Sequence, residues 1–322
     1  MKGLARRLLR AETPRISDAL PMPMPLACRL LLLSLALSGP AVAAPIYKYV
    51  DANGVVTYTD KAQKGAKVMT FSDDPIERLD QRVKLQPRHY AGGTVLEVRN
   101  DSFLPVTVTL RLSALQNVSG VGAAPIRKVL PARSLTRLAT LIAPDPGRPQ
   151  RYTPQLTTLM GSATPVFASG FAYPLPWLGG PFNVSQGAGG GFSHNTPKSR
   201  YAVDIAMPEG TPIVVSRAGQ VVEVENDQDG RGNHPSGNFV RILHDDGTMS
   251  VYLHLQRGSI KVAEGQWVRT GQALASSGNT GRSTGPHLHF VVQRNTGEAV
   301  ESIPFRFAQA VDSLPNFAVG GP

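Results

Sequence analysis

Three short segments of the sequence carry a histidine or an aspartate where a buried strand would be apolar. Residues 287–290, His-Leu-His-Phe, read as a strand, and because residues i and i+2 of a strand share a face, His287 and His289 point the same way. By the same rule, Tyr252 and His254 share one face of a second predicted strand. Asp204 lies on the small-residue face of a third.

These residue types can bind a metal ion. A carboxylate flanked by apolar strand positions is costly to bury without a partner cation. Imidazole nitrogens and carboxylate oxygens are ligands of Zn²⁺, and three protein ligands with an open position for water characterise a catalytic zinc site. If the three strands meet at one groove, the sequence predicts a zinc site there.

The strands that position these residues lie in a region from 173 to 310. This region also contains an Asp246-Gly247 hairpin turn and a strand–turn–strand bend over residues 265–274. We therefore predict an antiparallel, barrel-like β domain. Its expected strands are Tyr201–Ala206, Pro212–Ser216, Gln220–Glu225, Phe239–Leu243, Ser250–Leu255 and His287–Val292.

Two smaller β regions are predicted before it. Residues 44–88 contain two aromatic, β-branched runs around Asn53-Gly54, a strong hairpin signal, and resemble a small domain of unknown function that opens many exported proteobacterial proteins. Between residues 90 and 170, Val106, Val108 and Leu110 alternate with polar residues, which predicts a small β-sandwich scaffold without catalytic residues. The fold class is thus mainly β, with residues 311–322 as a C-terminal tail.

The beginning of the chain has the layout of a secretory signal. Arg29 precedes the apolar run Leu30–Leu37, and small residues follow at Ala41–Ala44, so cleavage is expected after Ala43. The run is far shorter than the roughly 20 apolar residues of a spanning helix, so no transmembrane anchor is expected after cleavage. We predict an exported, periplasmic protein with residues 1–43 as signal peptide.

The polar stretch before the apolar run suggests that translation starts at Met22 or Met24. The single cysteine, Cys28, precedes the apolar core, which argues against a lipoprotein anchor and excludes a disulfide framework.

Composition and charge set further limits. The chain has 322 residues, 27 Pro, 32 Gly and a net charge of +10, of which residues 1–43 contribute +4. The Pro and Gly content favours a turn-rich β protein. A mildly basic body fits adhesion to an anionic polymer or membrane surface, or ordinary solubility charge. Nucleic-acid binding is not expected, because the C-terminal region lacks a basic stripe.

Several motifs of the C-terminal region together resemble the lysostaphin/LytM-type zinc endopeptidases of peptidoglycan. The resemblance covers about 130 residues and rests on Phe192-Ser193-His194, residues 200–212 around Asp204, Tyr252-Leu253-His254-Leu255 and Gly285-Pro286-His287-Leu288-His289-Phe290. It implies one Zn²⁺ per chain held by His194, Asp204 and His289, with His254 and His287 facing the metal-bound water. It also implies that this water attacks the scissile carbonyl of peptidoglycan stem peptides and cross-bridges.

Within that resemblance, His287 is interpreted as the general base and His254 as the oxyanion stabiliser, although the two roles could be exchanged. Many members place the first histidine four residues before the aspartate, whereas here nine residues separate His194 from Asp204. Another departure is Val291, which stands where an acidic residue often follows. His244, beside Asp245-Asp246-Gly247, is expected to be solvated at a hairpin end.

Three other functions compete with this one. A catalytically inactive LytM-type module that activates a cell-wall amidase is the main alternative, with wall-hydrolase regulators as partners. A biotinyl or lipoyl carrier is disfavoured because no Lys lies at the matching turn of residues 265–274. A sugar-permease phosphocarrier is cytosolic, which contradicts the export signal. The proteobacterial resemblance of the N-terminal region favours the D-alanyl-diaminopimelate cross-link as target over a glycine bridge.

Overall fold

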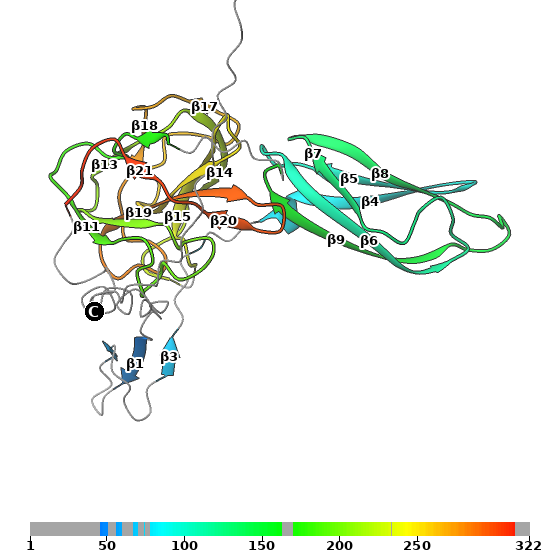
Figure 1. Ribbon diagram of the computed structural model, residues 1–322, viewed down its shortest axis with the longest axis horizontal. Helices are drawn as coiled ribbons and strands as arrows, with labels where there is room; N and C mark the ends of the chain where they lie inside the picture. The colour runs from blue at the N-terminus through cyan, green and yellow to red at the C-terminus, as the bar shows by residue number, and fades with distance from the viewer. Residues whose placement is uncertain are drawn as a thin grey trace, which may run out of the picture. The chain divides into compact units, whose positions relative to one another are not determined.

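A computed structural model describes residues 46–50, 56–59, 67–69, 74, 78–162, 170–232 and 234–312. The predicted signal peptide, residues 1–43, and most of the predicted tail lie outside the described residues. No helix in these ranges has the length and hydropathy that a membrane span requires. The protein is nearly all β, as predicted (Figure 1).

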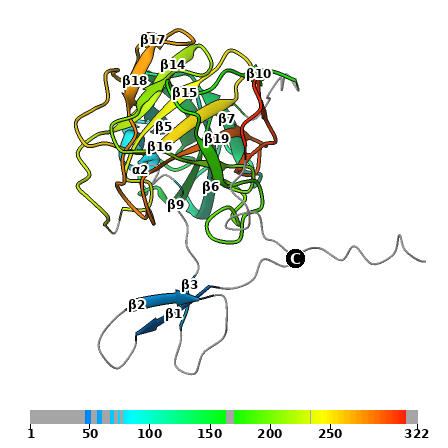
Figure 2. The ribbon, with the colours of Figure 1, turned by 90° about the vertical axis from the view of Figure 1, so that its left-hand side faces the viewer.

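The first sheet has three short strands, β1 (Ile46–Val50), β2 (Val56–Thr59) and β3 (Lys67–Met69). The central strand, β1, pairs antiparallel with both others (Figure 2). The two predicted aromatic runs therefore pair as expected, while the Asn53-Gly54 turn itself lies outside the described residues.

Two three-stranded antiparallel sheets follow the short helix α2 (Leu79–Arg82). Leu96, Leu110 and Leu141 are fully buried between them and form a sandwich core. One sheet has the order β4-β5-β8 and the other β7-β6-β9. Their strands are β4 (Val83–Tyr90), β5 (Gly93–Asn100), β6 (Val106–Gln116), β7 (Ile126–Leu130), β8 (Ser134–Ile142) and β9 (Arg151–Met160).

A glycine closes the hairpin between β4 and β5. Gly93 has φ +151°, and a Cβ at this position would lie only 1.9 Å from the backbone oxygen of Leu141 on β8. Only glycine permits this close approach. Strand β4 pairs with β5 along its whole length, so residues 83–90 belong to the sheet β4-β5-β8. The boundary between the two predicted N-terminal regions, at residues 88–90, stays a prediction.

The C-terminal region is built on one large sheet of order β11-β12-β19-β16-β15-β14-β17, with β20 added to β19. Two small sheets, β13-β18 and the parallel pair β10-β21, lie beside it. The strands are β10 (Ala172–Tyr173), β11 (Asn183–Gln186), β12 (Val203–Ala206), β13 (Pro212–Val214), β14 (Gly219–Glu225), β15 (Asn238–Leu243), β16 (Met249–Leu255), β17 (Trp267–Val268), β18 (Ala273–Ser276), β19 (His287–Asn295), β20 (Val300–Ser302) and β21 (Arg306–Phe307).

The two faces of this sheet carry different side chains. One face carries the main core, in which Ile205, Tyr252, Leu288 and Phe290 are fully buried. Side chains alternate along a strand, so His287 and His289 on β19 lie on the opposite face from Leu288 and Phe290. The predicted alternation thus separates the core of the domain from its polar residues.

An apolar cluster joins the sandwich to the large sheet. Val98, Leu104 and Met160 of the sandwich pack with Val222 of β14 and Met249 of β16. A two-point ion pair flanks it, with Arg82 donating to both carboxylate oxygens of Glu264 at 2.6 and 2.8 Å. The sandwich is therefore fixed to the sheet by both apolar packing and paired charges.

Candidate metal centre

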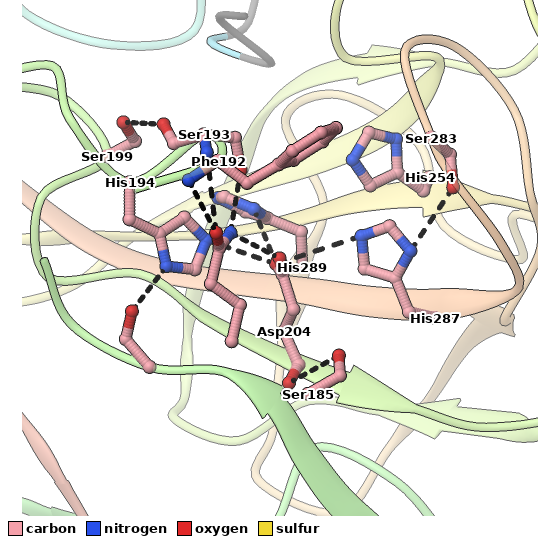
Figure 3. Close-up of polar contacts among 12 residues, drawn as sticks. Ser185, Phe192, Ser193, His194, Ser199, Asp204, His254, Ser283, His287 and His289 are labelled. Atoms are coloured by element: carbon pink, nitrogen blue, oxygen red, sulfur yellow. Dashed lines mark hydrogen bonds and ion pairs between the residues drawn. The ribbon is translucent and has the colours of Figure 1, made fainter. Parts of the chain in front are cut away.

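Neighbouring strands of the large sheet bring the predicted site residues together. Asp204 on β12 is directly opposite His289 on β19, and His289 is in turn opposite Leu253 on β16. His287 lies two residues before His289 on the same face of β19. In Figure 3 the imidazoles of His194, His287 and His289 surround the Asp204 carboxylate.

Three of these side chains form a compact donor set. Oδ1 of Asp204 lies 3.2 Å from Nε2 of His194 and 2.9 Å from Nδ1 of His289. The three donor atoms all lie within 4.8 Å of one another, and all three residues are buried. Two imidazole nitrogens and one carboxylate oxygen at this separation match the ligands of a catalytic zinc site, so the chemistry of the donor set fits a metal ion.

His194 reaches this cluster from the loop that follows β11. Its backbone N–H donates to Gly190 O at 3.1 Å, and its Nδ1 lies 2.7 Å from Gly187 O. Because a carbonyl oxygen only accepts, Nδ1 carries the hydrogen and leaves the lone pair of Nε2 directed at Asp204. The long spacing between His194 and Asp204 is therefore taken up by a loop that also sets the tautomer of the histidine.

His254 is in the cluster by a route that strand alternation does not predict. Tyr252 is buried in the main core, whereas the His254 ring lies 4.6 Å from that of His287 and 6.0 Å from that of His289. The expectation that Tyr252 and His254 share a face is therefore wrong. His254 has φ +61°, a left-handed conformation that ends the regular alternation of β16 and turns the ring into the site.

Backbone carbonyls orient both remaining histidines. Nδ1 of His254 lies 2.8 Å from Thr280 O, and Nδ1 of His287 lies 2.8 Å from Gly285 O. Both contacts place a hydrogen on Nδ1, so in the neutral form of each ring Nε2 carries the lone pair and can accept a proton. Nε2 of His287 lies 3.7 Å from Oδ1 of Asp204.

Burial tunes the protonation of two groups in the cluster. It lowers the pKa of His287 to about 4, an effect that the charge of Asp204 only partly opposes. Burial alone would raise the pKa of Asp204, but the adjacent imidazoles of His194, His287 and His289 hold it well below its usual range. At neutral pH the site therefore contains an ionised carboxylate and a neutral His287.

Sequence reasoning missed Gln186, which holds the second oxygen of Asp204. Its Nε2 donates to Asp204 Oδ2 at 2.9 Å and to Ser193 Oγ at 2.8 Å, while its Oε1 accepts from the backbone N–H of Phe192 at 3.1 Å. Gln186 thus links the carboxylate to the loop that carries His194. Its strand, β11, has little apolar patterning, so no sequence signal marked this residue.

The structure also corrects the expectation for His244. This residue is 3% exposed instead of solvated, and its Nδ1 lies 2.9 Å from Ala218 O. Burial lowers its pKa to about 4. It packs near Tyr173, with ring centroids 6.3 Å apart, and so belongs to the fold and not to the metal-binding cluster.

Comparisons with known proteins identify the family to which this region is similar. Residues 198–302 match the model described as Peptidase family M23. The chain contains a peptidase family M23 domain. Residues 33–87 match the domain of unknown function DUF4124, which confirms the resemblance of the N-terminal region. The M23 family implies a metal, and His194, Asp204 and His289 form a candidate site for it; His194 lies just before the matched range.

Curated relatives and solved structures are also similar to parts of this chain. The chain is 49% identical over 88 residues to Peptidoglycan DD-endopeptidase ShyA of Vibrio cholerae, covering 27% of this chain and 18% of ShyA. It is 37% identical over 109 residues to lysostaphin of Staphylococcus simulans, covering 33% of this chain and 21% of lysostaphin. The chain thus spans about a fifth of the length of these relatives. The crystallised catalytic domain of the M23 protein EnpA from Enterococcus faecalis is 26% identical, with a TM-score of 0.32, over 42% of this chain and 95% of that domain.

Proposed function

We propose that this protein is a zinc-dependent endopeptidase that hydrolyses the peptide cross-links of bacterial peptidoglycan. One observation carries the proposal: His194, Asp204 and His289 present their donor atoms within 4.8 Å of one another, directly beside the rings of His254 and His287. A structural histidine cluster would not need two further oriented imidazoles next to a complete donor set. Relatives named as peptidoglycan DD-endopeptidases support the substrate class.

Zinc is the metal that we propose for the site. Two imidazole nitrogens and one carboxylate are borderline ligands that suit Zn²⁺ better than Ca²⁺ or Mg²⁺, which prefer oxygen. When bound, Zn²⁺ supplies a water of lowered pKa and polarises the scissile carbonyl. The contacts from Gly187 O to His194 and from Gln186 to Asp204 orient two of the ligands, as outer hydrogen bonds do at metal sites.

His287 is proposed as the general base. Because burial lowers its pKa to about 4, the ring is neutral near pH 7 and its Nε2 can accept a proton. The hydrogen bond from its Nδ1 to Gly285 O fixes which nitrogen does so. His287 and the ligand His289 lie on the same face of β19, which places this Nε2 beside the metal-binding cluster.

His254 is proposed to stabilise the oxyanion that forms when the carbonyl is attacked. Its Nδ1–H is committed to Thr280 O, so only Nε2 can face a substrate oxygen, and it donates there when the ring is protonated. The buried position of His254 keeps its hydrogen bonds free from competition with bulk water. An exchange of roles between His254 and His287 leaves the rest of the proposal unchanged.

The setting proposed for the reaction is the periplasm, where the predicted signal peptide would deliver the chain. The D-alanyl-diaminopimelate cross-link is the bond that we propose is cut. The names of the relatives from Vibrio cholerae, peptidoglycan DD-endopeptidases, support this choice over a glycine bridge.

The test is digestion of purified sacculi with the exported protein, followed by mass spectrometry of the released fragments. The proposal expects new amino termini at diaminopimelate residues and a loss of cross-linked dimers. If zinc-loaded protein releases no fragment but stimulates a purified cell-wall amidase, the protein is an activator and the endopeptidase proposal fails. Cleavage of a synthetic peptide that contains a glycine bridge would contradict the proposal that the D-alanyl-diaminopimelate cross-link is the bond cut.

A further inference from the structure

The outward face of the sheet β4-β5-β8 collects basic side chains. These strands lie side by side, and their register places residues two apart on β5 in successive rows (Figure 1). The opposite face of the same sheet holds the sandwich core with Leu96 and Leu141. The outward rows are Lys84–Arg99–Leu135, Gln86–Glu97–Arg137, Arg88–Val95–Thr140 and Tyr90–Gly93–Ile142.

The charge of this face is strongly one-sided. Lys84, Arg88, Arg99 and Arg137 are all exposed, against the single carboxylate of Glu97 within the rows. Glu97 lies 3.6 Å from Arg88. In the described part of the chain, Lys84 and Arg137 form no ion pair, so their charges are available to a partner. We call the exposed residues Lys84, Arg88, Arg99 and Arg137, together with Tyr90, Leu135 and Ile142, the basic face.

Exposed apolar side chains lie among these cations. Eight large hydrophobic side chains of the described residues are exposed, and three of them are on the basic face: Tyr90 at 44%, Leu135 at 49% and Ile142 at 48%. Leu135 ends the row that begins with Lys84, and Tyr90 and Ile142 share the last row. Leu135 thus lies in a row with two cations, and Tyr90 and Ile142 lie at the end of the face, next to the row of Arg88.

We propose that the basic face docks the protein on an anionic phospholipid bilayer. Cations of the face complement phosphate headgroups, while Tyr90, Leu135 and Ile142 can enter the boundary between headgroups and acyl chains. Eight-residue antiparallel strands make the face about 27 Å long, which suits a planar surface. An anionic polymer such as peptidoglycan satisfies the cations but offers no apolar layer for Leu135 and Ile142, so the bilayer is the favoured partner.

This inference does not depend on the proposed peptidase activity, because the basic face contains none of the metal-site residues. It predicts that hydrolysis and membrane association can be separated by mutation. It also assigns a role to the sandwich, which the sequence marks only as a scaffold.

The experiment is co-sedimentation of the exported and processed protein with vesicles. The two vesicle types are phosphatidylethanolamine alone and phosphatidylethanolamine with phosphatidylglycerol, and the amino terminus is first checked by mass spectrometry, because a retained apolar leader would itself bind lipid. We expect binding only to the vesicles that contain phosphatidylglycerol. Binding should disappear near 1 M salt, where the screening length is about 3 Å.

Two matched double variants test the face itself. Lys84→Gln with Arg137→Gln should weaken partitioning about 30-fold, because each cation near an anionic surface contributes about fivefold. Arg111→Gln with Arg151→Gln removes the same charge from strands β6 and β9 of the other sheet and should leave partitioning within about twofold of wild type on the same scale. Leu135→Ser should weaken binding without changing its salt dependence.

Three results would overturn the proposal. The first is wild-type protein that ignores both vesicle types. The second is an equal loss in the two double variants, which would reduce the effect to net charge. The third is a Lys84→Gln/Arg137→Gln variant that no longer binds purified sacculi but still binds vesicles as wild type does. The basic face would then recognise the polymer and not the bilayer. Zinc content and sacculus digestion, measured on the same variants, should stay at wild-type values.

Discussion

Replacing His244 by asparagine should remove a defined part of the pH dependence of stability. Burial lowers the pKa of His244 to about 4 from 6.5, with the nearby Arg217 adding to the effect and Asp245 and Asp246 opposing it. The folded state therefore resists protonation that the unfolded chain accepts below pH 6.5. The free energy of unfolding falls as pH decreases from 6.5 to about 4, because the unfolded state binds the extra proton.

The magnitude follows from the size of the shift. One pKa unit corresponds to about 1.4 kcal/mol, so the shift of His244 corresponds to about 3 kcal/mol of unfolding free energy, present above pH 6.5 and lost by about pH 4. Asparagine can still donate to Ala218 O in place of Nδ1 but leaves part of the ring volume empty. At pH 7 the variant should therefore be less stable by about 1–3 kcal/mol.

The assay is urea unfolding at a series of pH values between 7 and 4, with a chelator present so that metal release does not contribute. Between pH 7 and pH 4 wild type should lose about 3 kcal/mol more than His244→Asn, so that at pH 4 the variant is as stable as wild type or more stable. His244→Phe, which keeps a ring but loses the donor, should give the same change with pH despite different packing. A difference that stays constant from pH 7 to pH 4 would refute the argument.

Three further predictions address other parts of the molecule. Gln186→Leu removes the donor to Asp204 Oδ2 and should weaken zinc affinity about 10–100-fold, measured by competition with a chelator, while Gln186→Glu should weaken it further by placing two carboxylates together. Arg241→Met leaves the buried Glu223 carboxylate, 3.1 Å from Arg241 Nε, without this partner and should cost about 3–5 kcal/mol in urea unfolding, a loss that a second change, Glu223→Leu, should largely restore. Amino-terminal sequencing of the exported protein should begin at Ala44, and recovery of residues 1–43 on the purified protein would contradict the signal peptide.

The parts of the fold that could be predicted are those specified by local patterns. The alternation of polar and apolar residues in His287–Phe290 correctly predicted the two faces of β19. Leu288 and Phe290 lie in the core, and His287 and His289 lie on the opposite face. Asp204 was noticeable as a carboxylate in an apolar strand, and the structure places it opposite His289. Such signals need only the period of a strand and the cost of burying a charge.

The parts that could not be predicted depend on contacts distant in sequence or on a single backbone angle. His254 enters the site through its positive φ, which a periodic pattern does not encode. His244 is buried in part by Tyr173, which is distant in the sequence but packs near its ring. Gln186 acquires its role only when β11 pairs with β12 beside Asp204. In each case the residue gains its orientation or its partners only in the tertiary fold.

The most direct test of the central claim is zinc content and sacculus hydrolysis measured in the same preparations of wild type, Asp204→Ala and His287→Ala. The account predicts one zinc per chain and hydrolysis for wild type, and loss of both for Asp204→Ala. His287→Ala should retain its zinc and its fold but lose at least about 10²-fold in turnover, because it lacks the general base. Hydrolysis by zinc-free wild-type protein, or wild-type turnover in His287→Ala, would contradict the account.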